Sequence, residues 1–314
     1  MALEQLWQAY CRGGDAGVQA IPPANALESF YRALFAFDAQ DIAQAMHYAS
    51  QAARQAPEQL VFAQAAAYLQ RILPAGRSNV YVDDAGFAAF IRGGGNLPLY
   101  ARVSAALRQI YQTYPQLRLF DIGVGDGRAL LPALTANISQ LDVLEPSAAM
   151  LRKLCALLDQ RGLPYQASCC PLQEFVRAPR GNWDVIQATF SLQSLSPQER
   201  PALLAWLRAH GQRVLLVEFD VPAFDAMFAP DRVQSIVARY ARGLAEYEET
   251  RDRVAQGFLM PVFFGYFDQT AQRTNYEQPL TAWVQALQAA GFRSVQAQLL
   301  YSYWWAPAYL LDAS

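Results

Sequence analysis

The 314-residue sequence has few lysines and histidines, so it offers few candidates for lysine or histidine catalysis. Lys153 is its one lysine, and His47 and His210 are its two histidines. We expect His47 in an N-terminal helix and His210 at the end of a helix that connects two strands. Neither position is at the edge of the sheet where a ligand would bind. We therefore expect both to be surface or packing residues, and we expect no bound metal.

Disulfides, strong net charge and long apolar runs are also missing. The four cysteines include the adjacent pair Cys169 and Cys170, a spacing that suits neither a metal nor a bridge, so we expect reduced thiols. A net charge of -2 offers no basic surface to nucleic acid. The longest nearly apolar run, residues 258–267, is too short to cross a bilayer, and no charged-then-apolar leader opens the sequence. We expect a cytoplasmic protein with no membrane partner.

Residues 1–75 have the pattern of an all-helical extension. Asn25 stands where a helix N-cap is expected, Asp41 opens the next helix, and Pro74 follows a third helix. The alanine-rich run 43–53 resembles one tetratricopeptide-type hairpin, but the sequence has no second copy. We expect the extension to be a helical cap or a homodimer surface, with a peptide-binding module as the alternative.

From residue 117 onward the pattern changes. Short apolar runs rich in β-branched residues alternate with amphipathic helices, which is typical of an α/β domain with a parallel sheet. We expect residues 76–116 to form a lid and a connecting helix, and residues 117–314 to form the main domain, with an aromatic-rich cap inserted at about 222–275. The expected strands cover residues 117–122, 140–144, 165–168, 184–188, 213–219, 294–299 and 304–311.

A glycine-rich turn follows the first expected strand. Asp121 ends the strand, and Gly123, Gly125 and Gly127 then let the backbone turn sharply and leave room for a ligand against the main chain. Glu145 ends the second expected strand, where a carboxylate can bind the two hydroxyls of a ribose. The sequence therefore predicts a nucleoside-binding site at this edge of the sheet.

Three segments resemble motifs of class I S-adenosylmethionine-dependent methyltransferases, in that family's order. They are Leu119 to Gly127, Leu144 to Leu151 and Trp183 to Pro197. The fold that this resemblance implies is α/β, a Rossmann-like, seven-stranded, mostly parallel sheet, here with an N-terminal all-helical extension and a cap insertion. NAD-dependent enzymes usually keep GxGxxG, which the loop lacks because Arg128 stands at the last position.

The resemblance also implies roles for individual residues toward S-adenosylmethionine. Asp121 and the glycines would face its methionine part, Glu145 would bind its ribose, and Pro146 with Met150 would border its adenine. The family's usual acid after the third strand is replaced by Ser168, Cys169 and Cys170, so main-chain or cysteine contacts, Cys170 among them, are expected there. The cofactor-binding residues that we expect are Asp121, Gly123, Gly125, Gly127, Glu145, Pro146, Met150, Cys170, Phe190 and Arg92.

The catalytic candidates are Glu218, Gln193 and Tyr247. Gln193 follows the fourth expected strand and Glu218 lies near the end of the fifth, and ligands of an open α/β sheet bind at the carboxyl ends of its strands. Gln193 stands where the family often has a histidine. Glu218 could orient or deprotonate an acceptor, or equally bond the loop after the fifth strand. Tyr247 belongs to the aromatic insertion, whose rings pack a cap onto the sheet or wall an acceptor pocket.

Residues 76–100 resemble the lid that many such enzymes carry. Tyr81 and Tyr100 would fold over the cofactor, and Arg92 would meet a carboxylate. The run Gly93–Gly95 suits a hinge, and a simple turn between helices explains it nearly as well.

The expected function is transfer of a methyl group from S-adenosylmethionine to N, O or C of a small-molecule acceptor. Amino-acid-derived and natural-product metabolites are the acceptor classes considered. The alternatives are a cofactor-binding scaffold that recruits a partner through its N-terminal helices, and a protein methyltransferase.

Overall fold

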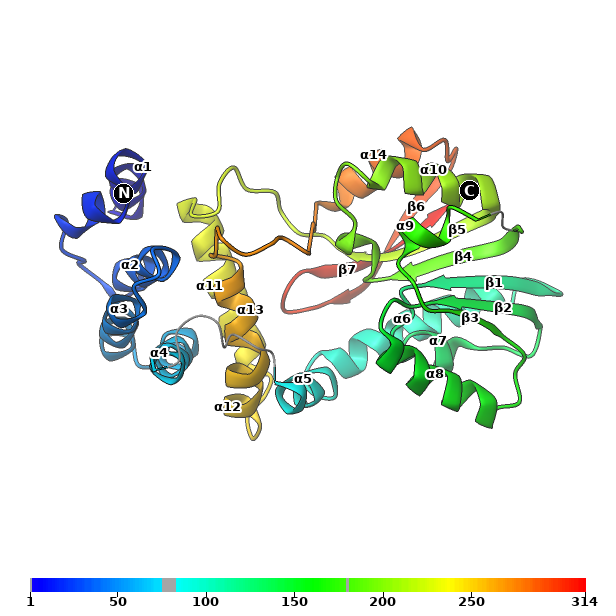
Figure 1. The fold of residues 1–314 in the computed structure, drawn as a ribbon, viewed down its shortest axis with the longest axis horizontal. Coiled ribbons are helices and arrows are strands. Elements are labelled where there is room, and N and C mark those ends of the chain that lie inside the picture. The colour runs from blue at the N-terminus through cyan, green and yellow to red at the C-terminus, as the bar shows by residue number, and fades with distance from the viewer. Residues whose placement is uncertain (1, 75–82, 179–180) are drawn as a thin grey trace. The chain divides into compact units, whose positions relative to one another are not determined.

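A computed structural model describes residues 2–74, 83–178 and 181–314 (Figure 1). The chain forms two compact units, and each contains segments that are distant in sequence. One unit, called the helical unit below, comprises residues 1–97 and 224–272. The other, called the sheet unit, comprises residues 98–223 and 273–314.

The helical unit contains every helix expected in the N-terminal extension. Asn25 caps the second helix, as predicted, by accepting a hydrogen bond from the Glu28 amide. Asp41, which was expected to open a helix, caps the third helix by accepting one from the Gln44 amide. The helices are α1 (Ala2–Gln19), α2 (Ala26–Asp38), α3 (Ile42–Gln55), α4 (Leu60–Ile72), α5 (Asp84–Ile91), α11 (Pro230–Ala245), α12 (Arg251–Val254), the π-helix Ala255–Leu259 and α13 (Met260–Gly265).

The inserted segment at 222–275 is more helical than its sequence indicated, and its rings pack differently. Phe263 on α13 lies 5.7 Å from Phe30 on α2, between ring centroids, and Phe264 lies 4.6 Å from Phe37 and 5.2 Å from Tyr68. All five residues are buried. These rings therefore form a core with the N-terminal helices, whereas the sequence led us to expect packing onto the sheet. The contacts stabilise the unit through buried apolar area and favourable tilted ring pairs.

The sheet unit is built on a seven-stranded, mostly parallel sheet, as predicted, and its strand order is β3-β2-β1-β4-β5-β7-β6. The first five strands in sequence run parallel, and β7 pairs antiparallel with both β5 and β6. The strands are β1 (Leu117–Ile122), β2 (Ile138–Leu144), β3 (Gln166–Ser168), β4 (Trp183–Thr189), β5 (Gly211–Phe219), β6 (Val295–Ser302) and β7 (Pro307–Ala313).

Helices cover both faces of this sheet (Figure 1). The helices are α6 (Asn96–Tyr111), α7 (Leu130–Ala133), α8 (Ala148–Gln160), α9 (Leu172–Phe175), α10 (Arg200–His210) and α14 (Leu280–Ala289), with the 3₁₀ turn η2 (Leu192–Ser194). One face buries Phe120 and Ile186 with α9, α10 and α14, including Trp283. Because side chains alternate along a strand, Asp121 and Gln187 point to the opposite face. There Gln187 meets Tyr111 of α6.

Within the described part of the chain, no helix combines the length and the apolar character needed to cross a membrane.

Candidate cofactor site in the sheet unit

The glycine loop after β1 has the backbone conformation that its sequence predicted. Gly123, Gly125 and Gly127 have φ angles of 67°, 59° and 84°, in the left-handed region that favours glycine. The Gly123 and Val124 amides donate to the Leu144 carbonyl at 2.8 and 3.2 Å. The loop therefore closes over the end of β2, beside Glu145.

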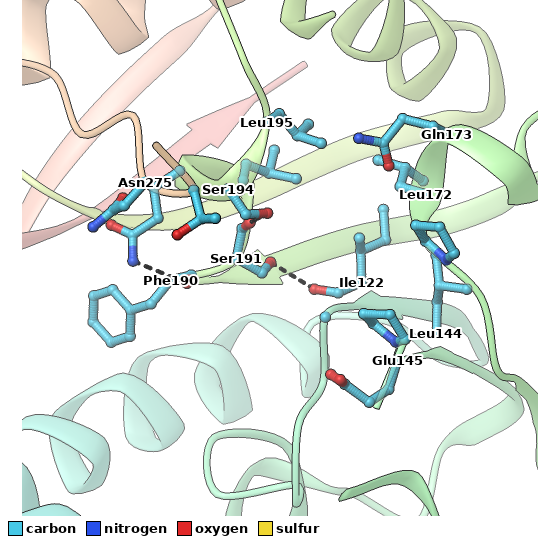
Figure 2. A pocket seen from close by; sticks show the side chains of 16 residues that line it. Ile122, Leu144, Glu145, Leu172, Gln173, Phe190, Ser191, Ser194, Leu195 and Asn275 are labelled. Atoms are coloured by element: carbon cyan, nitrogen blue, oxygen red, sulfur yellow. Dashed lines mark hydrogen bonds between the residues drawn. The ribbon is translucent and has the colours of Figure 1, made fainter. Parts of the chain in front are cut away.

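Gly123 is also required by the segment that follows β4. A β-carbon at Gly123 would lie 2.4 Å from the Cβ of Ser191, closer than any real contact. The Ser191 hydroxyl donates to the Ile122 carbonyl at 2.7 Å, which holds the two segments together (Figure 2). The carboxyl ends of β1 and β4 are thus joined directly at the edge where ligands bind in such sheets.

Glu145 is a buried carboxylate held by backbone donors. It is 7% exposed, and its Oε2 accepts from the Gly125 amide at 2.9 Å while Oε1 accepts from the Ser147 amide at 2.8 Å. Ser147 in turn caps α8. Each carboxylate oxygen accepts more than one hydrogen bond, so Glu145 keeps capacity for a ligand hydroxyl while it anchors the loop.

Asp121 lies deeper, at the end of β1. It is 2% exposed, and its Oδ2 accepts from Nε2 of Gln187 at 2.7 Å. The amide oxygen of Gln187 accepts from the Tyr111 hydroxyl. Burial raises the pKa of the Asp121 carboxyl to about 7, the negative charge of Glu145 adds to this, and the Gln187 hydrogen bond opposes it.

A pocket of about 360 Å³ opens beside these residues (Figure 2). It is formed entirely by the sheet unit. Glu145 is the charged member of its lining, and the rest is apolar or neutral polar. The lining residues are Ile122, Gly123, Leu144, Glu145, Pro146, Pro171, Leu172, Gln173, Phe190, Ser191, Leu192, Gln193, Ser194, Leu195, Thr274 and Asn275.

Phe190 enters this lining with a strained backbone. Its φ is 51°, which is a rare conformation for a bulky residue. The Phe190 amide donates to the Val217 carbonyl at 2.8 Å. The ring stacks on Phe219 with centroids 4.4 Å apart, and Tyr100 contacts it edge-on at 6.1 Å. The stacking and the hydrogen bond together hold Phe190 in its strained conformation.

Gln193 and Glu218 lie near each other, and their contacts favour supporting roles. Nε2 of Gln193 donates to the Phe190 carbonyl at 3.3 Å. Glu218 is 1% exposed and accepts from the Leu192 amide at 3.1 Å. Burial raises its pKa to about 8, while the backbone donors of Gln193 and Leu192 and the charge of Arg200 act in the opposite direction. Glu218 thus holds the turn after the fourth strand, and not a loop after the fifth strand as we had considered.

The other predicted site residues have different surroundings. Pro146 lines the pocket, whereas Met150 and Cys170 do not. Met150 is 36% exposed in the first turn of α8, and Cys170 packs against the core on the α9 side of the sheet. Among the described residues, no group of three or more histidine, cysteine or acidic side chains is arranged to hold a metal ion.

Tyr247 and Arg92 belong to the helical unit, so the structure does not group them with the pocket residues. The Tyr247 hydroxyl donates to the Phe90 carbonyl at 3.0 Å and accepts from Nδ2 of Asn96 at 3.0 Å. It is 3% exposed, and burial raises its pKa above the usual range. Arg92 is exposed at the end of α5. These contacts favour a structural role for Tyr247.

The expected lid is described only in part, because Tyr81 and the rest of 75–82 lie outside the described residues. Gly94 has a φ of 51°, and a β-carbon there would lie 2.8 Å from the Tyr247 ring. Oε2 of Glu246 accepts from the Gly95 amide at 2.7 Å. The glycine run is therefore a tightly packed turn between α5 and α6, which favours the turn over the hinge.

Sequence reasoning missed three contributors to the site. Ser191 and Gln187 lie within a recognised segment but match no motif position, and Asn275 comes from the distant end of the insertion. Gln187 did carry a signal, because it is a polar residue between apolar ones on a central strand and is 0% exposed. Buried polar side chains of this kind are hydrogen-bonded and often belong to a site.

Comparison with known proteins finds no matching family model and no matching curated protein. Among solved structures, the chain is similar to magnesium protoporphyrin IX methyltransferase from Synechocystis PCC 6803 with bound S-adenosylhomocysteine. The identity is 15%, the TM-score is 0.48, and 74% of this chain and 95% of that chain are covered. It is also similar to the 1,6-didemethyltoxoflavin-N1-methyltransferase of Burkholderia thailandensis, with 15% identity, a TM-score of 0.46 and coverage of 68% and 77%.

Proposed function

We propose that the chain is an S-adenosylmethionine-dependent methyltransferase that acts on a small molecule. The observation that carries the proposal is the contact between the glycine loop and Glu145. A backbone that leaves room for a ligand at Gly125 lies directly beside a buried carboxylate at the tip of β2, and a pocket lined by Gly123 and Glu145 opens next to them. A ligand with a ribose and a cationic amino-acid tail fits this donor and acceptor set.

The residues present fit such a cofactor. Glu145 would hold the two ribose hydroxyls, since its oxygens retain lone pairs after accepting the two backbone amides. Pro146 would border the base, because it follows Glu145 and lines the pocket. Asp121 would act beneath the loop as a negative group that favours a cation.

When bound, S-adenosylmethionine would supply a methyl group on a positively charged sulfur for transfer to a lone pair of the acceptor. The chain's own contribution is to position the two molecules and to exclude water. Phe190, fixed by Phe219 and the Val217 carbonyl, forms a rigid wall at the end of β4. Gln193 and Glu218 keep the turn that carries this wall in place.

The part of the pocket lining that is not assigned to the cofactor is neutral, which suits a small, largely uncharged acceptor. Ser194, Thr274 and Asn275 contribute neutral polar groups. Pockets of this size, mostly apolar with a few polar groups, are typical of small-molecule sites. Metabolites of amino-acid or natural-product type are the acceptors to test first, at N, O or C.

Two experiments test the proposal. Isothermal titration calorimetry should show that S-adenosylhomocysteine binds the purified full chain at one site. Incubation with S-adenosylmethionine carrying a tritiated methyl group, together with a metabolite mixture, should then transfer the label to a small molecule and release S-adenosylhomocysteine. Binding without turnover on any acceptor would instead favour a scaffold, and transfer of the label to protein would favour a protein methyltransferase.

A further inference from the structure

Three buried side chains beneath the glycine loop form a series of hydrogen bonds, and the series ends at a carboxyl oxygen for which the described part of the protein supplies no partner. It runs from the hydroxyl of Tyr111 on α6 to the amide of Gln187 on β4, and from there to Oδ2 of Asp121 on β1. The other carboxyl oxygen, Oδ1, is buried and has no hydrogen-bond partner among the described residues. All three residues belong to the sheet unit.

The orientation of the Gln187 amide follows from its neighbours. The Tyr111 hydroxyl donates to the amide oxygen, so the NH₂ group is directed at Asp121. An NH₂ group can donate to the carboxyl but cannot accept from it. It therefore stabilises the ionised form of Asp121 in one fixed orientation.

Burial and the neighbouring charge, in contrast, disfavour the ionised form of Asp121. Burial disfavours its ionised form, and Glu145 is the charged group whose field adds to that effect. A buried carboxyl with one unpartnered oxygen is unfavourable in either protonation state, because a proton on Oδ1 would have no acceptor and a charge there would have no donor. A cation placed above the loop would stabilise the ionised form of Asp121, because charges interact strongly where water is excluded.

We propose that Tyr111 and Gln187 are positioning residues that hold Asp121 ready for a cationic ligand group, so that binding of the cofactor's ammonium releases the Asp121 proton to solvent. The inference rests on the proposed function and deepens it. The step balances, because Asp121 loses one proton and the buffer takes it up while the cation compensates the new carboxylate. The pKa of about 7 that burial gives Asp121 puts the release in an accessible pH range.

The experiment measures the proton exchanged when S-adenosylhomocysteine binds the full chain. Calorimetry in two buffers with different ionisation enthalpies gives the number of protons released. At about pH 6 we expect close to one proton, and at about pH 8 close to none. The affinity should rise up to about tenfold per pH unit below pH 7 and then level off. Methylthioadenosine, which lacks the amino-acid tail, should bind without releasing this proton.

Three variants assign the proton and test the positioning. Asp121→Asn should bind without proton release at any pH. Gln187→Met removes the donor and should move the pH midpoint upward, so that release persists at about pH 8, and Tyr111→Phe should move it by less in the same direction. Ser139→Ala, at the opposite end of β2, is the matched control and should leave the midpoint unchanged. If Gln187→Met does not fold, Tyr111→Phe carries the test.

The inference is overturned if the wild-type chain binds S-adenosylhomocysteine at about pH 6 without releasing a proton, or if Asp121→Asn releases as much as wild type. Equal release with methylthioadenosine would also contradict it. In each of these cases the proposed function stands. No binding of S-adenosylhomocysteine at any pH would overturn both.

Discussion

Gly123 and Ser191 approach each other so closely that no side chain fits between them, with a built β-carbon only 2.4 Å from the Cβ of Ser191. Gly123→Ala should therefore lower the free energy of unfolding by both a steric and a backbone effect. Gly162→Ala is the matched control, because Gly162 also has a positive φ, 63°, but a β-carbon there would meet no described atom within 4 Å. The backbone effect alone is about 1–2 kcal/mol. Chemical denaturation should show a clearly larger loss for Gly123→Ala, and equal losses would contradict the packing described here.

Removal of the Glu145 carboxylate should weaken cofactor binding. Glu145→Ala eliminates the proposed ribose contact and frees the Gly125 amide, and we expect a loss of about 1–3 kcal/mol in the binding of S-adenosylhomocysteine. Calorimetry measures it. Glu174→Ala, an exposed acid on α9, is the control and should bind as wild type does. A folded Glu145→Ala variant with unchanged affinity would refute the assignment.

A substitution at Tyr247 distinguishes a structural role of this residue from a catalytic one. Tyr247→Phe removes the hydrogen bonds of the hydroxyl to the Asn96 amide and the Phe90 carbonyl, while these two groups stay bonded to each other, and should lower the unfolding free energy by about 0.5–1.5 kcal/mol. Once an acceptor is known, the rate of methyl transfer by the folded variant should stay within a few-fold of wild type. A large loss of rate at full stability would restore Tyr247 as a catalytic residue.

Asp121 and Glu218 should make the ligand-free chain less stable as the pH rises. Burial raises the pKa of Asp121 from 3.8 to about 7 and that of Glu218 from 4.5 to about 8, so between these values the folded chain binds more protons than the unfolded chain. Their contribution is fully present below the unfolded values and is lost as the pH rises through the folded ones. The slope is at most about 1.4 kcal/mol per pH unit for each group.

Urea denaturation between about pH 5 and pH 8 measures this slope. Glu218→Gln keeps the shape and cannot titrate, so it should flatten the upper part of the profile. A wild-type profile that rises with pH over this range would show that the two carboxyls are ionised in the folded chain.

Elements determined by local pattern could be read from the sequence. The bounds of β1 were predicted to the residue, the cap at Asn25 was placed correctly, and the helix expected to open at Asp41 begins one residue later. The left-handed glycines after β1 follow from a turn that only glycine adopts easily. These features depend on neighbouring residues, so a sequence reveals them.

Features that depend on a distant partner could not be read in the same way. The rings of Phe263 and Phe264 indicated an apolar face in the sequence. No neighbouring residue indicates that these rings pack against Phe30 and Phe37. For the same reason the contact between Gly123 and Ser191 was not foreseen, although each segment was recognised. Periodicity identifies which side of an element is buried, and only the fold identifies what covers it.

The discontinuous origin of the helical unit affects both its synthesis and any attempt to divide the chain. On the ribosome, α2 and α4 emerge with Phe30, Phe37 and Tyr68 long before α13 supplies Phe263 and Phe264. Meanwhile their apolar surface is open to chaperones or to aggregation. Deleting the first 97 residues would create the reverse problem by uncovering α11 to α13. A soluble sheet unit therefore requires that both segments be removed together, with a short linker joining residues 223 and 273.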